Sequence, residues 1–163
     1  MRILFDTNVI MDFIVKREPF SSNAETAIGL CMSNSSIQAC ISAHTVPNLY
    51  YILRKHLKPE QRRDVLLNIC TMFAVVGIEA DKLIAALQNE NFTDFEDCLH
   101  AECAKCFAAD YIVTRNTKDF TGSTIPALEP TDLINVLQMQ KIANETIEGD
   151  TNQTEAVESA DTQ

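Results

Sequence analysis

Carboxylates stand at two points of the chain where a short apolar run ends. Asp6 directly follows the run Arg2–Phe5, and Asp119 lies shortly beyond the run Tyr111–Thr114. An acid that directly follows a buried strand needs a hydrogen-bonding partner or a cation to offset the cost of its desolvation. We therefore interpret Asp6 as a functional residue.

A second group of acids opens the helical segment that precedes the last of these runs. Thr93 and Glu96 have the spacing of a capping box, in which both side chains satisfy free amides at a helix start, so we expect Glu96 to be structural. Asp94 and Asp97 are three residues apart and share one helix face. They fit either a role at the positive end of the helix dipole or a role as ligands.

Three segments that are distant in the sequence therefore carry carboxylates. Carboxylate oxygens are the ligands that hard divalent cations such as Mg²⁺ prefer. A site of this kind can activate water and stabilise the oxygens of a phosphodiester during hydrolysis. Because buried like charges repel one another, we expect the cluster to destabilise the fold when no ion is bound.

The apolar pattern of the chain predicts the elements that must position these acids. Four run-like segments fit buried strands: Arg2–Phe5, Ile37–Ile41, Phe73–Ile78 and Tyr111–Thr114. Six segments have helical periodicity: Ser21–Met32, Leu49–Leu57, Pro59–Met72, Asp81–Gln88, Phe95–Phe107 and Pro130–Gln140. This alternation predicts a three-layer α/β/α sandwich around a parallel sheet of four or five strands. Ligands of such sheets bind beyond the carboxyl ends of the strands, where the acids lie.

Composition divides the 163 residues into one domain, residues 1–142, and an acidic tail, residues 143–163. The tail holds six of the 23 acidic residues and none of the 13 basic ones, and its composition predicts disorder. The net charge of −10 argues against a generally cationic nucleic-acid or membrane binder. No run approaches the ~20 apolar residues of a membrane span, so we expect a cytoplasmic protein without membrane attachment.

Cys98, His100, Cys103 and Cys106 invite a zinc interpretation. All four lie in one predicted helix, whereas a closed zinc site needs ligands that converge from separate turns or strands. We interpret the cysteines as reduced core thiols, as is usual in the cytosol.

Three segments of the sequence resemble motifs of a known family. The opening segment Ile3–Phe13, ILFDTNVIMDF, resembles the first-strand motif of the PIN domain, found in VapC-like metal-dependent ribonucleases. The segments Asp94–Leu99, DFEDCL, and Ala109–Phe120, ADYIVTRNTKDF, resemble the later acidic helix, last core strand and threonine-rich turn of that family. The resemblance spans roughly residues 1–138, in the family's order and spacing.

The resemblance implies hydrolysis of single-stranded RNA by a water activated by Mg²⁺ or Mn²⁺. Asp6 and Asp97 would hold the principal ion, and Asp94 and Asp119 would be secondary ligands or would position water. Thr114 would orient the site through a hydrogen bond. Small bacterial PIN proteins are often toxins that pair with an antitoxin and form homodimers, so the resemblance implies both kinds of partner.

Two positions depart from the pattern of active family members. Asn48 occupies the place of the family's second acid, and Asn116 the place where its fourth acid often falls. An asparagine can coordinate through its carbonyl oxygen but brings no charge, so metal affinity should fall. The alternative function is therefore a catalytically silent PIN-like module that binds RNA or a protein partner.

Basic residues near the predicted crevice are the candidates for phosphate contact. Arg115 and Lys118 follow the last strand, and Asn116 between them could orient a phosphate. A further basic concentration spans residues 54–63, where a solvated helix junction is the simpler interpretation.

Overall fold

Five parallel strands form the central layer of the protein, in the order β3-β2-β1-β4-β5. The computed structural model describes residues 1–143. The strands are β1 (Arg2–Phe5), β2 (Gln38–Ser42), β3 (Ala74–Val76), β4 (Tyr111–Val113) and β5 (Ala127–Leu128). β1 is central, with Leu4 in register with Cys40 of β2 and Ile112 of β4. The parallel sheet predicted from the sequence is confirmed.

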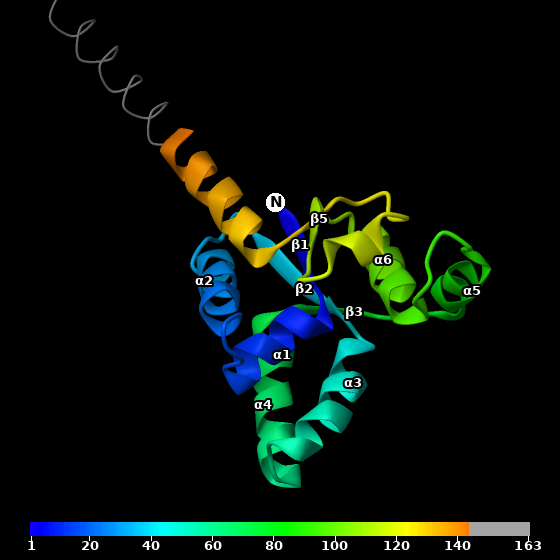
Figure 1. The fold of residues 1–163 in the computed structure, drawn as a ribbon, viewed down its shortest axis with the longest axis horizontal. Helices are drawn as coiled ribbons and strands as arrows, with labels where there is room; N and C mark the ends of the chain where they lie inside the picture. Colours follow the sequence, from blue (N-terminus) through cyan, green and yellow to red (C-terminus); the bar gives the residue numbers. More distant parts are fainter. Residues whose placement is uncertain (144–163) are drawn as a thin grey trace, which may run out of the picture.

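Helices cover both faces of this sheet (Figure 1). They are α1 (Thr7–Val15), α2 (Ser21–Met32), α3 (Thr45–Ile52), α4 (Pro59–Met72), α5 (Ala80–Gln88), α6 (Phe95–Phe107) and a C-terminal helix over residues 130–143. Two short 3-10 helices, η1 (Leu53–Lys55) and η2 (Thr117–Phe120), follow α3 and β4. Within residues 1–143 no helix is long and apolar enough to cross a bilayer.

Alternate residues of β1 point to opposite faces of the sheet. Ile3 and Phe5 are buried against α1 to α4 and the C-terminal helix, whereas Leu4 is buried against α6. α5 packs on α6 through a smaller cluster around Ala86. The three layers of the predicted α/β/α sandwich are therefore present.

Two elements lie outside the sequence prediction. Only Asp6 separates β1 from α1, most of the nine residues of α1 are apolar, and no side chain caps its start. β5 has two residues, too few for a periodic pattern. α3 also begins earlier than predicted, at Thr45. Pro47 falls in its first turn, where proline does not interrupt a helix.

The predicted tail falls almost wholly outside the described part of the chain. Ala143, its first residue by the sequence prediction, still belongs to the C-terminal helix. Residues 144–163 lie outside the described residues.

The strand order determines where a site can form. The chain proceeds from β1 outward to β2 and β3, then crosses to the other side of β1 through α5 and α6 to form β4. Neighbouring strands whose connections leave in opposite directions create a crevice at their carboxyl ends. This crevice lies between the ends of β1 and β4.

α6 ends in a Schellman motif that aims the chain into β4. The N–H of Ala109 donates to the carbonyl of Ala104, and the N–H of Ala108 donates to Lys105. Ala108 has a φ of 53°, a left-handed conformation that glycine adopts without steric cost.

Replacing this residue tests the strain. Ala108→Gly is expected to raise the free energy of unfolding by roughly 0.5–1 kcal/mol, because glycine relieves the left-handed strain at the end of α6. Ala85→Gly, inside α5, serves as the matched control and is expected to lower it by about 1 kcal/mol. Urea denaturation of the three proteins measures both effects, and destabilisation by Ala108→Gly would contradict the interpretation.

Candidate active site

A cavity of about 820 Å³ opens at the carboxyl ends of β1 and β4. Its lining includes most of the residues singled out in the sequence: Asp6, Asn48, Asp94, Asp97, Arg115, Asn116 and Asp119. Thr114 is buried and hydrogen-bonded to Asp6. The structure does not bring Lys118 to the cavity, since this residue is exposed on η2 and absent from the lining.

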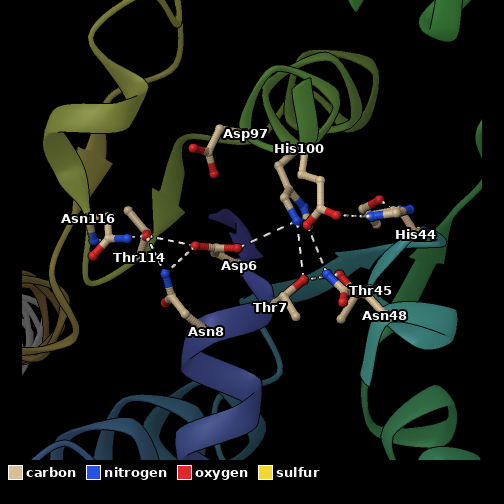
Figure 2. Close-up of polar contacts among 12 residues, drawn as sticks. Asp6, Thr7, Asn8, His44, Thr45, Asn48, Asp97, His100, Thr114 and Asn116 are labelled. Atoms are coloured by element: carbon tan, nitrogen blue, oxygen red, sulfur yellow. Dashed lines mark hydrogen bonds and ion pairs between the residues drawn. The ribbon is translucent and has the colours of Figure 1, made fainter. Parts of the chain in front are cut away.

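Two side chains hydrogen-bond the carboxylate of Asp6, and only 5% of the residue is exposed. Thr114 Oγ1 donates to Asp6 Oδ2 over 2.7 Å, and Asn8 Nδ2 donates to the same oxygen (Figure 2). Asn8 Oδ1 in turn accepts the N–H of Arg115 at 3.2 Å. These bonds join the first turn of α1 to the end of β4 and fix the orientation of Asp6.

Asp97 is the carboxylate whose charge is least compensated. It extends from α6 toward Asp6 (Figure 2). Burial, together with the negative charges of Asp6, Asp94, Asp119 and Glu96, raises the pKa of Asp97 to about 7. Such a group of mutually repelling carboxylates is what a divalent cation would neutralise.

The carboxylates fit a cation by charge and by chemistry. Within residues 1–143, however, no three histidine, cysteine, aspartate or glutamate side chains are arranged to hold an ion together. Binding through this group would therefore combine a few carboxylates with retained waters, which is the usual coordination of Mg²⁺ in proteins.

Asp94 is the N-cap of α6. Its Oδ1 accepts the N–H of Glu96 at 2.7 Å and the N–H of Asp97 at 3.3 Å. The capping box expected between Thr93 and Glu96 is therefore wrong, because Asp94 performs the capping alone. Asp94 also lines the cavity, so capping and a role in the site are compatible.

Glu96 is turned toward α3 instead. Asn48 Nδ2 donates to Glu96 Oε2 over 2.9 Å, and His44 Nε2 lies 3.3 Å from Glu96 Oε1. The amide at position 48 thus holds a carboxylate that comes from α6. Sequence reasoning could not find this pair, since 48 residues separate the partners.

His100 is a site residue that the sequence interpretation missed. It is 2% exposed, and its Nε2 lies 3.5 Å from Asp6 Oδ1 and 3.2 Å from Thr7 Oγ1. Thr7 Oγ1 also lies 3.2 Å from Thr45 Oγ1, so the two hydroxyls and the imidazole form one buried polar group. Burial lowers the pKa of His100, and the charge of Asp6 opposes this shift. The available signal was its position three residues after Asp97 on one helix face.

The turn after β4 contributes a second set of polar groups. The N–H of Asn116 donates to Thr114 Oγ1 over 3.1 Å, so one hydroxyl orders both Asp6 and the turn. Arg115 Nε forms an ion pair with Asp12 Oδ2 at 2.9 Å. Asp119 lies on η2 and contributes its charge to the cavity.

The charge on Asp97 makes metal-free stability depend on pH. The pKa of Asp97, about 7, lies above that of an ordinary aspartate, so the folded state holds the proton more tightly than the unfolded state, and stability falls as pH rises from about 4 to about 7. Asp97→Asn is therefore expected to be more stable than the wild type at pH 8 by about 1 kcal/mol, allowing for solvent screening.

Thermal unfolding in EDTA at pH 4 and pH 8 measures this difference, which should vanish at pH 4. Asp132→Asn, an equal charge change at an exposed position of the C-terminal helix, is the control and is expected to alter stability little. Equal stability of the wild type and Asp97→Asn at pH 8 would mean that the charge is already compensated.

Several known structures of toxin-antitoxin proteins have a similar fold. VapBC-1 from nontypeable Haemophilus influenzae aligns with a TM-score of 0.63 at 18% identity, covering 80% of this chain and 99% of the other. A toxin-antitoxin complex from Klebsiella pneumoniae aligns with a TM-score of 0.60 at 23% identity, covering 78% of this chain and 97% of the other. VapBC2 from Rickettsia felis, bound to a DNA fragment from its promoter, aligns with a TM-score of 0.58 at 21% identity, covering 79% of this chain and 98% of the other. At these identities the likeness is one of fold.

Sequence comparison gives the family directly. No curated protein matches the chain. A family model described as the PIN domain matches residues 2–118, which include β1, the acidic start of α6 and the turn after β4. The resemblance inferred from the motifs is thereby confirmed, and the chain belongs to the PIN domain family.

Proposed function

We propose that this protein is a metal-dependent endoribonuclease that hydrolyses phosphodiester bonds of single-stranded RNA. PIN domains are generally nucleases, which supports this activity at the level of the family. The observation that carries the proposal is the uncompensated group of carboxylates around Asp97, gathered at the crevice between β1 and β4.

Each acidic residue of the cavity would have its own role in this reaction. Asp6 and Asp97 would hold a Mg²⁺ or Mn²⁺ ion, with Asp94 and Asp119 as further ligands or positioners of water. When bound, such an ion supplies a water of lowered pKa and offsets charge on the phosphate oxygens. Thr114 fixes Asp6 through its 2.7 Å hydrogen bond, so the principal ligand needs little reorganisation to bind.

Glu96 adds a carboxylate at the place where Asn48 lacks one. Asn48 and His44 hold both Glu96 oxygens at the wall of the cavity, so a negative charge is present on this side of the site. We propose that Glu96 orients a metal-bound water, and that Asn48 positions Glu96 rather than binding the ion.

A second candidate function is a catalytically silent module that binds RNA or a protein. It is favoured by the lack, within the described residues, of three side chains arranged to hold an ion, and by Asn116 in the turn after β4. Metal binding distinguishes the two functions.

We propose further that the protein acts in the cytoplasm as the toxin of a toxin-antitoxin pair and forms a homodimer. The similar folds of the Klebsiella pneumoniae and Haemophilus influenzae proteins support an antitoxin as partner. The acidic cavity would be the part of the surface that such a partner must neutralise or cover.

Calorimetric titration with Mn²⁺ is the direct test of the site. The wild type is expected to bind saturably, whereas Asp6→Asn and Asp97→Asn should lose most of the binding, because each removes a charged ligand. Asp132→Asn controls for net charge and should bind as the wild type does. No saturable binding by the wild type at millimolar Mn²⁺ would overturn the nuclease proposal and favour the silent module.

Cleavage of RNA tests the chemistry that would follow. Asp6→Asn is expected to lower the cleavage rate of total bacterial RNA by about 100-fold or more. Induced expression should arrest bacterial growth for the wild type and not for Asp6→Asn. Cleavage that survives Asp6→Asn would reveal a contaminating nuclease.

The hydrogen bond from Thr114 to Asp6 can be tested in the same assay. Thr114→Val should lower the cleavage rate about tenfold because it removes this hydrogen bond, and Thr114→Ser should restore the cleavage rate.

A further inference from the structure

The cavity that gathers the carboxylates also has basic side chains. Arg17, Lys55, His56 and Arg115 line it, from the end of α1, from the segment around the end of η1 and from the turn after β4. A cation would neutralise only the carboxylates. The basic side chains of the same cavity therefore call for an anion.

The guanidinium of Arg115 is held in place before any ligand arrives. Its Nε lies 2.9 Å from Asp12 Oδ2, and its plane lies over the ring of Phe20, 4.5 Å from the centroid. Asn8 fixes the backbone N–H of the same residue. The ion pair is formed at Nε, so the two terminal nitrogens of the guanidinium keep their donors for an anion in the cavity.

Asp12 is the buried group on which this arrangement depends. It is 1% exposed and does not line the cavity. Within residues 1–143 neither of its carboxylate oxygens has a hydrogen-bond partner. Burial raises the pKa of Asp12, and the charges of Arg115 and then Arg17 oppose this shift.

The end of α1 places Arg17 beside the same carboxylate. Lys16 turns the chain through a left-handed conformation with a φ of 53°, and the N–H groups of Lys16 and Arg17 both donate to the carbonyl of Asp12. Asp12 thus compensates two cations that both line the cavity. A buried carboxylate is costly, and a well-packed apolar residue often stabilises a core as well as an ion pair does.

We propose that Arg17 and Arg115 form an anion subsite that binds a backbone phosphate of RNA next to the bond to be cleaved, and that the buried carboxylate of Asp12 positions Arg115. The identity of the ligand as RNA rests on the proposed function. Arginine suits this role because its planar donors match phosphate oxygens, and a positioned guanidinium loses little freedom on binding. Asp12 is a positioning residue in this subsite and does not touch the ligand.

The sign of the effect of Asp12→Asn separates positioning from overall charge. This variant removes a negative charge, which by itself should strengthen binding of a polyanion. The proposal expects the reverse, a roughly tenfold weaker affinity for a short single-stranded oligouridine, because the guanidinium of Arg115 loses its anchor. Fluorescence anisotropy in EDTA measures this affinity without cleavage. Unchanged or tighter binding by Asp12→Asn would overturn the positioning role.

A surface variant keeps the test decisive if Asp12→Asn does not fold. Arg17 is exposed, so Arg17→Ala should fold normally, and it is expected to weaken oligouridine binding about tenfold. Lys118→Ala is the matched control, an equal charge change at an exposed residue outside the cavity, and should have a smaller effect. Equal losses for both variants, or no binding by the wild type, would overturn the subsite.

The outcome is separable from that of the nuclease proposal. If Mn²⁺ binding fails while Arg17→Ala still weakens RNA binding, the subsite stands on a protein that binds RNA without cleaving it. If Mn²⁺ binds and RNA is cleaved, but the Michaelis constant of Arg17→Ala and Asp12→Asn matches that of the wild type, the subsite is overturned and the nuclease proposal stands.

Discussion

The burial of negative charge at the junction of β1 and β4 is the constraint on which the rest of this structure depends. Asp6 ends the central strand, where solvent reaches little of it. A carboxylate in that position must be hydrogen-bonded or paired. The fold satisfies it with the hydroxyl of Thr114, the amide of Asn8 and the imidazole of His100, which come from three different elements. The contacts that form the site are therefore also the contacts that hold these elements together.

A second consequence of this constraint is the imbalance of charge around the cavity. The contacts that stabilise Asp6 do not extend to Asp97, whose neighbours are mostly other carboxylates. Beside the same cavity, the charge of the buried Asp12 is offset by the charges of Arg115 and Arg17. One pocket thus combines unpaired negative charge with positioned positive charge. This is the combination that a metal ion and a phosphodiester together would neutralise.

The scaffold explains why so small a domain can hold these groups precisely. Most of the polar residues of the site come from regular elements or from the residue directly beyond them. β1 and β4 are paired in register from Ile3 to Phe5, and α6 is fixed at its start by Asp94 and at its end by the Schellman motif. Short, packed elements restrict the side chains they carry more than long loops do. The spacing of Asp6, Asp97 and Thr114 is therefore a property of the core packing.

Local pattern was sufficient for several of these features. The alternation of apolar runs and helical segments predicted the layers, α6 was predicted with its observed bounds, and the motifs around Asp6 and Asp97 predicted the family. These features depend on residues that are close in sequence, where periodicity and spacing carry the information. α1 was missed because most of its nine residues are apolar, so no polar face marks it as a helix.

The sequence by itself determined the fold class, the family and the convergence of acidic segments at one edge of the sheet. Only the tertiary structure decided how those acids are paired. Glu96 is held by Asn48 instead of closing a capping box, His100 lies against Asp6, and Lys118 does not line the cavity that Arg115 lines. Each of these outcomes depends on partners tens of residues distant, or on which face of a short turn meets the core. Long-range packing selects among side-chain arrangements that local sequence leaves equally open.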